Sequence, residues 1–204
     1  MAQSSLYTAH YLLLKDGTLG PWPIVEMSDE GEVLSVELHP EGLKERPGLQ
    51  LHGGLLMAGL VDVGPMDASL NYTQRVLNRH YSSGTLYLGA KSADTPFYPP
   101  PFLLKSLETT ASPLPFLRRN AQNYQTPLLD RIRQYCKQMP SLNWLELISE
   151  AAAWAAAQRA DLKDKGSIEP GCKSGLLVIK NLDLNKMVIT NNMVLKWLVV
   201  PSNK

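Results

Sequence analysis

The sequence lacks the features that mark membrane-spanning, secreted and nucleic-acid-binding proteins. No apolar run approaches the roughly 20 residues that a membrane helix needs, and the first residues show neither the basic nor the apolar region of a signal peptide. The net charge is only +1, from 20 basic and 19 acidic side chains, so no field strong enough to attract phosphate backbones or anionic lipids is expected. We therefore predict a cytoplasmic protein that binds neither nucleic acid nor a membrane surface.

Cysteine and histidine, the usual protein ligands of transition metals, are also scarce. Cys136 and Cys172 stand in unrelated contexts without a CxxC partner, so the sequence indicates reduced thiols and neither a disulfide framework nor a zinc knuckle. No HxH, HxxH or HxxxH spacing places two histidines on one metal ion. The four histidines, expected to be surface or satisfied polar residues, are His10, His39, His52 and His80. Neither a metal site nor a bound cofactor is predicted.

Strand-like segments stand at the two ends of the chain. They are short, apolar and rich in β-branched residues, and turn-forming pieces such as residues 15–17 (KDG) and 28–31 (SDEG) separate them. The expected strands cover residues 7–14, 24–27, 33–38, 54–60, 175–179, 187–190 and 194–200. Pairing both ends into one sheet would hide edges that otherwise invite aggregation. The predicted fold class is α+β, with a discontinuous β-sandwich formed by both chain ends.

The middle of the chain is expected to be mainly helical. Thr126 and Pro127 have the residue types of an N-cap and a first helical position, and Pro140 should end the helix that they begin. Ser141 is expected to cap a second helix that runs through the alanine-rich residues 151–157. Its apolar stripe would consist of Leu142, Leu145, Ile148 and Ala152.

Between residues 64 and 125 the pattern is weaker. Residues 72–80 are compatible with a helix and residues 85–89 with a buried strand. The prolines of residues 96–102 (PFYPPPF) fix φ and remove amide donors, which favours an extended stretch. Such a stretch is either a stiff loop that packs on its own protein or a ligand for a proline-recognising domain.

Two motifs at opposite ends of the helical middle resemble the amidohydrolase superfamily, in particular its chlorohydrolase and adenosine-deaminase-like branch. Residues 55–62 (LLMAGLVD) resemble the family's LLMPGLVD lead into the first barrel strand. Residues 145–157 resemble the helix before the chain returns to the sandwich, and residues 166–176 (GSIEPGCKSGL) resemble GSIEPGKxADL. The resemblance implies the family's composite β-sandwich domain and, in active members, metal-dependent hydrolysis of non-peptide carbon–nitrogen bonds.

The sequence departs from this family where a metal would bind. In active relatives the lead-in is followed at once by a His-x-His pair that holds a divalent ion, but here the matching positions read Gly64, Pro65 and Met66. Residues 88–92 (LGAKS) resemble the LGTDS strand end, whose Asp binds metal and relays a proton. That position is Lys91, and an ammonium group repels a cation unless burial neutralises it.

The chain is also too short for the barrel that the resemblance implies. About 100 residues lie between the two sandwich halves, whereas a complete eightfold barrel takes roughly 200 to 250 residues. The predicted organisation is therefore a discontinuous β-sandwich of residues 1–63 plus 166–204, with residues 64–165 as a helical and loop remnant in place of a complete TIM barrel.

These observations favour a non-catalytic, amidohydrolase-like protein, a pseudoenzyme with a structural or interaction role. Its partner would be a second copy or another protein, bound through the exposed sandwich or helix face. One alternative is a metal-dependent hydrolase of carbon–nitrogen bonds, or new chemistry built from Asp62, Asp67, Lys91 and Asp94. A third interpretation, a module that binds a small molecule or a peptide, stays open because function depends on the site and not on the fold.

Overall fold

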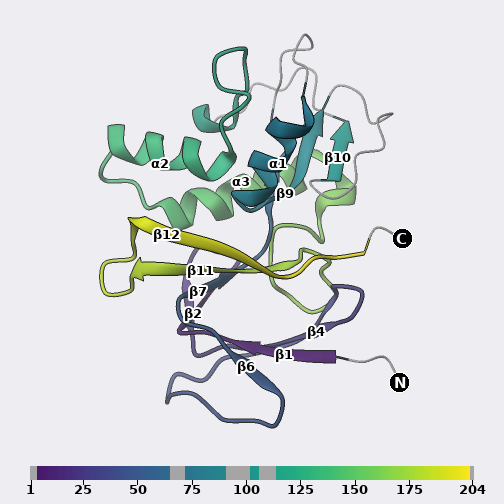
Figure 1. Cartoon of the computed structure of the whole chain (residues 1–204), viewed down its shortest axis with the longest axis vertical. Helices are drawn as coiled ribbons and strands as arrows, with labels where there is room; N and C mark the ends of the chain where they lie inside the picture. The colour runs from purple at the N-terminus through teal and green to yellow at the C-terminus, as the bar shows by residue number, and fades with distance from the viewer. Residues whose placement is uncertain (1–3, 65–71, 91–101, 106–113, 203–204) are drawn as a thin grey trace. The chain divides into compact units, whose positions relative to one another are not determined.

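The computed structural model describes residues 4–64, 72–90, 102–105 and 114–202. The chain forms two compact units, of which the first combines residues 1–59 with residues 164–204 and the second consists of residues 60–163. Figure 1 follows the chain from the strands of the first unit through the helices of the second and back to strands β11 and β12. The sequence prediction had placed the two boundaries after residue 63 and before residue 166.

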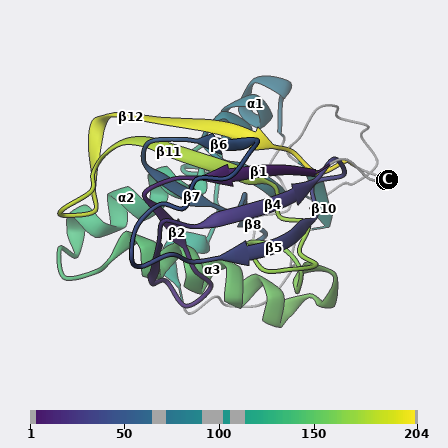
Figure 2. The same ribbon diagram turned by 90° about the horizontal axis from the view of Figure 1, so that it is seen from below.

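The first unit contains a four-stranded and a five-stranded sheet, both with parallel and antiparallel neighbours. Figure 2 shows the strands of the four-stranded sheet side by side. Its order is β5 (Val33–Glu37), β4 (Ile24–Ser28), β1 (Ser4–Thr8) and β6 (Leu49–Leu51). The order of the five-stranded sheet is β12 (Val188–Val199), β11 (Leu176–Asp183), β7 (Leu55–Met57), β2 (Tyr11–Leu13) and β3 (Leu19–Pro21).

Strands from the two chain ends pair in the five-stranded sheet. β7, from the first third of the chain, lies antiparallel to β11, with Leu56 opposite Val178. The expected pairing of the ends is therefore present. One apolar core serves both sheets of this unit, because it combines buried side chains of β1, β4 and β5 with those of β2, β7 and β11. These are Tyr7, Val25, Met27 and Val33 from the first sheet, and Leu12, Leu56, Leu176 and Val178 from the second.

Two segments that the sequence presented as single strands are each divided between two sheets. Residues 7–14 break at Ala9 and His10, so that β1 joins the four-stranded sheet and β2 the five-stranded one. Residues 54–60 break after Met57, where β7 ends, and β8 (Leu60–Asp62) begins after two intervening residues in the second unit. Residues 54–60 are apolar on both faces and residues 7–14 are mostly apolar, and neither pattern reveals where a chain leaves one sheet for another.

The second unit contains a parallel sheet as well as helices, so the prediction of a mainly helical middle was incomplete. β9 (Thr85–Ala90) lies between β8 and β10 (Phe102–Lys105), and both pairings are parallel. The strand expected at residues 85–89 is therefore confirmed as part of β9. The residues described in this unit form an open sheet and no closed barrel. Most of the proline-rich stretch, residues 96–101, lies outside the described residues.

Three α-helices are described in the second unit. α1 (Gln74–Ser82) stands between β8 and β9 in the sequence, and α2 (Leu128–Gln138) and α3 (Trp144–Gln158) follow η1 (Pro115–Leu117), a short 3-10 helix. A second 3-10 helix, η2 (Ala160–Leu162), comes after α3. α3 packs against β8 and α2 packs against α3, which brings both helices to the strand that the lead-in motif forms. None of the described helices is long and apolar enough to cross a membrane.

The predicted helix caps were shifted by one or two residues. α2 has Pro127 at its N-cap, while Thr126 donates its amide to the carbonyl of Asn123 and so belongs to the preceding turn. α3 is capped by Asn143, whose side-chain oxygen accepts from the amide of Leu145, and not by Ser141. Both asparagine and serine are good caps, so composition alone left the choice open. α2 does end before Pro140, as expected.

Candidate functional site

Asp62 lies at the carboxyl end of β8, where ligands commonly bind in open sheets of parallel strands. The strand is apolar apart from this residue, and all three of its side chains are buried. The Asp62 side chain is fully shielded from solvent. A buried carboxylate requires a positively charged or hydrogen-bonding partner, and this one has two arginines and a histidine around it.

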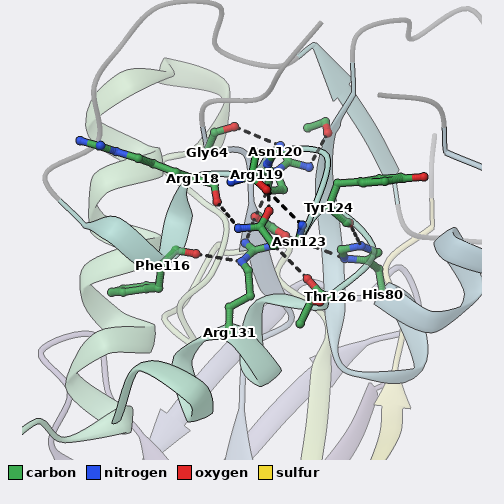
Figure 3. Close-up of polar contacts among 12 residues, drawn as sticks. Gly64, His80, Phe116, Arg118, Arg119, Asn120, Asn123, Tyr124, Thr126 and Arg131 are labelled. Carbon is green, nitrogen blue, oxygen red and sulfur yellow. Dashed lines mark hydrogen bonds and ion pairs between the residues drawn. The ribbon is translucent and has the colours of Figure 1, made fainter. Parts of the chain in front are cut away.

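Arg131 is the closest partner of Asp62. Its Nη2 donates to Asp62 Oδ1 across 2.7 Å. The other guanidinium nitrogens donate to backbone carbonyls, Nε to Phe116 across 2.8 Å and Nη1 to Thr126 across 3.0 Å. Figure 3 shows the side chain rising from α2 between these two carbonyl groups. Every nitrogen of the buried guanidinium is thus satisfied, which fixes its position relative to the carboxylate.

Arg119 joins the ends of the two neighbouring strands. Its Nη1 donates to the carbonyl of Gly89 on β9 and to the hydroxyl of Tyr72, both across 2.7 Å. Its Nη2 donates to the carbonyl of Gly64, just beyond β8, across 3.0 Å. The Nε atom lies 3.7 Å from Asp62 Oδ1, an ion-pair distance. Arg119 therefore covers the carboxyl ends of β8 and β9 with a side chain that is shielded from solvent.

His80, on the buried face of α1, is the third neighbour of Asp62. Its Nε2 lies 2.9 Å from the carbonyl oxygen of Tyr124 (Figure 3), and because a carbonyl only accepts, this nitrogen carries the hydrogen. Its Nδ1 faces Asp62 Oδ2 at 3.8 Å, which is too long for a hydrogen bond. Burial lowers the pKa of His80 despite the nearby carboxylate, so the ring is neutral at pH 7.

The charges of these residues determine what Asp62 can do. Burial alone would raise the pKa of Asp62, but Arg131 and Arg119 outweigh burial and hold the pKa below its usual range. Asp62 therefore stays ionised and is a weak proton acceptor. With His80 neutral, two guanidinium groups face one carboxylate and leave one positive charge in excess. The backbone carbonyls that accept hydrogen bonds from both arginines offset part of this excess positive charge. We call Asp62, Tyr72, His80, Arg119 and Arg131 the Asp62 cluster.

Of the four candidates predicted from the sequence, the structure describes only Asp62. Asp67, Lys91 and Asp94 lie outside the described residues. In the described part of the chain, no group of three or more His, Cys, Asp or Glu side chains is arranged to hold a metal ion.

The other members of the Asp62 cluster were missed by sequence analysis. Arg131 was the most detectable, because it stands on the apolar face of α2 with Leu128 and Ile132, where a lone charge requires a buried partner. The partner itself is 69 residues away, and nothing in the spacing indicated it.

Gly64 occupies the first position of the His-x-His pair that the resemblance aligns here. A Cβ at this position would lie 2.2 Å from the carbonyl oxygen of Leu117. The backbone conformation therefore has no room for any side chain, an imidazole included. The second position, residue 66, lies outside the described residues. Arg131 and Arg119 hold Asp62 Oδ1, whereas Oδ2 and His80 Nδ1 are buried without a hydrogen-bond partner and lie 3.8 Å apart. The described residues therefore offer one carboxylate oxygen and one imidazole nitrogen, fewer ligands than a divalent ion requires, beside two guanidinium groups that repel a cation.

Comparisons with known proteins give distant and partial matches. No protein-family model matches the sequence, and no curated protein is similar to it. Among solved structures, an enamidase described as a member of the amidohydrolase superfamily is 13% identical over 46% of this chain and 27% of its own, with a TM-score of 0.30. The chain thus has distant structural matches in the amidohydrolase superfamily.

Two further matches concern deacetylases and prolidases. N-acetyl-D-glucosamine-6-phosphate deacetylase from Mycobacterium smegmatis is 20% identical over 43% of this chain and 24% of its own, with a TM-score of 0.33. A putative prolidase from Bifidobacterium longum is 11% identical over 68% of this chain and 38% of its own, with a TM-score of 0.34. This chain spans about a quarter of the length of the first solved structures that it matches.

Proposed function

We propose that this chain is a non-catalytic, amidohydrolase-like protein. In it, Arg119 and Arg131 form ion pairs with the carboxylate of Asp62 at the end of β8, the first barrel-type strand. The observation that carries this proposal is the contact of Asp62 with Arg131 at 2.7 Å and with Arg119 at 3.7 Å, all three side chains being buried. A carboxylate in this state is a weak base and a poor ligand for a divalent ion, because its pKa is low and the two guanidinium groups that compensate its charge repel a cation.

The arrangement of the first unit supports the family part of this proposal. Two sheets share one apolar core, and the five-stranded sheet combines strands from both chain ends. We interpret this unit as the composite β-sandwich of the superfamily. The second unit is then a shortened relative of the barrel, with the parallel strands β8, β9 and β10 and three helices.

A structural or interaction role requires a surface for a partner, and the apolar residues at the edges of the first unit's sheets provide one candidate. β5 and β6 are the outer strands of the four-stranded sheet, and β12 is an outer strand of the five-stranded sheet. Large apolar side chains are exposed on or beside these three strands, namely Leu34, Leu38, Leu51, Val188 and Val194. Unpaired strand edges with apolar side chains are typical of surfaces that bind another chain, including a second copy.

An activity assay tests the proposal most simply. The protein would be offered N-acetyl-D-glucosamine-6-phosphate and Xaa-Pro dipeptides, the compounds named for the similar proteins, with zinc, manganese or iron(II) added. We expect the same background hydrolysis for the native protein and for Asp62→Asn. Turnover above background that Asp62→Asn abolishes would instead support the metal-dependent hydrolase.

The interaction role is tested separately by the mass of the protein in solution. Light scattering coupled to size-exclusion chromatography should give a defined oligomer, or a monomer that retains an apolar surface able to bind a hydrophobic dye. A monomer that binds no dye would count against a role based on exposed sheet edges.

A further inference from the structure

The second unit carries a pocket beside α1 that belongs neither to the Asp62 cluster nor to the family resemblance. Its volume is about 800 Å³, within the range of small-molecule sites. α1 supplies one side and the turn before α2 supplies the other. The described residues that line it are Thr73, Arg75, Val76, Asn78, Arg79, Ser82, Tyr124 and Gln125.

Among the described residues that line the pocket, all charged side chains are basic. Arg75 and Arg79 are four residues apart on α1, so their side chains lie on the same face of the helix one turn from each other. Both are exposed, and neither forms an ion pair within the described part of the chain. None of the described lining residues carries a carboxylate, and α1 itself contains no Asp or Glu. Two like charges at this spacing repel each other unless an anion binds between them.

The neutral lining residues add hydrogen-bond donors. Asn78 accepts from the side-chain amide of Gln74 through its Oδ1, which leaves its own NH₂ group directed elsewhere. Gln125 donates to the hydroxyl of Tyr124, so the hydrogen of this phenol is not used in that bond. The described lining residues therefore carry two guanidinium groups, an amide NH₂ and a phenolic O–H, donors suited to an acceptor with several oxygens.

One wall of the pocket is fixed from the protein interior. The carbonyl of Tyr124 accepts from the buried His80, and the Tyr124 ring meets the ring of Tyr72 edge-on, with centroids 5.5 Å apart. Figure 3 shows Tyr124 beside His80 at the edge of the Asp62 cluster. The opposite wall is a helix that Thr73 caps through a hydrogen bond to the amide of Val76. Both walls are thus set before a ligand binds, which lowers the entropic cost of binding.

We propose that this pocket binds a small molecule with a phosphoryl group, held between the guanidinium groups of Arg75 and Arg79. Phosphoryl oxygens are arranged tetrahedrally, so two arginines on one helix face can each donate to different oxygens of the same group. The apolar part of the ligand would rest on Val76 and the ring of Tyr124. This inference does not rest on the proposed function, because binding at α1 requires neither an active nor an inactive Asp62.

The probe for a test is inorganic pyrophosphate, titrated into the protein by calorimetry at constant ionic strength. We expect one saturable site, and at least about tenfold weaker binding in the double variant Arg75→Gln/Arg79→Gln, since one charge-assisted hydrogen bond is worth roughly a factor of ten. Circular dichroism should show unchanged folding, because both side chains are exposed. Citrate, which offers planar carboxylates in place of tetrahedral phosphoryl groups, should bind more weakly than pyrophosphate.

The matched control is Arg133→Gln/Lys137→Gln, which removes two basic side chains four residues apart on α2 of the same unit. It should keep pyrophosphate affinity within about twofold of the native protein. The absence of saturable binding would overturn the proposal. Equal weakening in both double variants would also overturn it, because the effect would then be one of general surface charge. Equal affinity for citrate would overturn the assignment to a phosphoryl group.

Discussion

Arg131 donates a 2.7 Å hydrogen bond to Asp62, and both side chains are buried. The pair joins α2 to the end of β8, and its two residues lie 69 positions apart in the sequence. A buried charge pair of this kind contributes little more than a well-packed apolar pair would, but removal of one partner leaves the other charge uncompensated. The loss of either partner therefore tests the arrangement directly.

Arg131→Met should lower the free energy of unfolding by about 3–5 kcal/mol, because Asp62 then keeps only the more distant Arg119 and two backbone carbonyls lose their donor. Denaturation by urea measures this loss. The control is Arg133→Met on the same helix, a partly exposed residue whose ion pair with Asp130 is 3.6 Å long and worth at most about 1 kcal/mol. Similar losses in the two variants would contradict the structure of the cluster.

Gly64→Ala should destabilise the protein by about 1–3 kcal/mol or more, because the new Cβ would lie 2.2 Å from the carbonyl oxygen of Leu117 and the backbone must move. Gly53→Ala is the matched control, since its Cβ would meet its nearest neighbour, His10, at 3.9 Å. Thermal unfolding of the two variants measures the difference. A Gly64→Ala variant as stable as Gly53→Ala would show that position 64 has room for a side chain.

Leu176→Ala should cost about 2–5 kcal/mol of stability, because this fully buried leucine of β11 contributes to the core that the two sheets of the first unit share. Val188→Ala, on β12, should cost far less, because the valine is 52% exposed. The comparison tests whether the C-terminal strands complete the core begun by the N-terminal ones. Near-equal effects in urea denaturation would indicate that they do not.

Stability should fall as the solution is acidified below about pH 6.5. Burial lowers the pKa of His80 below its usual 6.5, so the unfolded chain takes up a proton at a pH at which the folded chain does not. The contribution of neutral His80 to stability is complete above pH 6.5, and it is lost as the pH falls from 6.5 toward the lowered pKa of His80 in the folded chain. His52 contributes in the same direction, because burial, Lys180 and Lys196 also lower its pKa.

An NMR titration of the imidazole signals separates the two histidines. It should give His80 a midpoint below 6.5 and show the hydrogen on Nε2, and a midpoint above 6.5 would contradict the proposed burial.

A second loss of stability is expected below pH 3.8, as pH falls through the lowered pKa of Asp62.

Sequence analysis predicted the parts of the fold that depend on local pattern. The strands around residues 24–27, 33–38 and 85–89 and the helix ending before Pro140 are confirmed within a few residues. Pairing of the chain ends was predicted from the need to protect sheet edges, and β7 does lie beside β11. The changes of sheet at Ala9 and Leu60 were missed, because a segment of strand composition carries no mark of where its hydrogen-bond partner changes.

The Asp62 cluster was beyond sequence analysis for a different reason. Asp62 was named as a candidate, but its partners Arg119 and Arg131 come from a later turn and helix, and ion pairs between distant segments leave no periodic signal. The absence of the His-x-His pair could be read directly from the sequence. The lack of space for a side chain at Gly64 could not, because it depends on the approach of the Leu117 carbonyl.

Metal content tests the central claim most directly. The protein would be purified without chelator, incubated with equimolar zinc, manganese or iron(II), passed over a desalting column and measured by plasma mass spectrometry. If the carboxylate of Asp62 is held by Arg131 and Arg119, each metal should remain far below one equivalent per chain. One equivalent of metal that Asp62→Asn abolishes would contradict the account and favour the hydrolase instead.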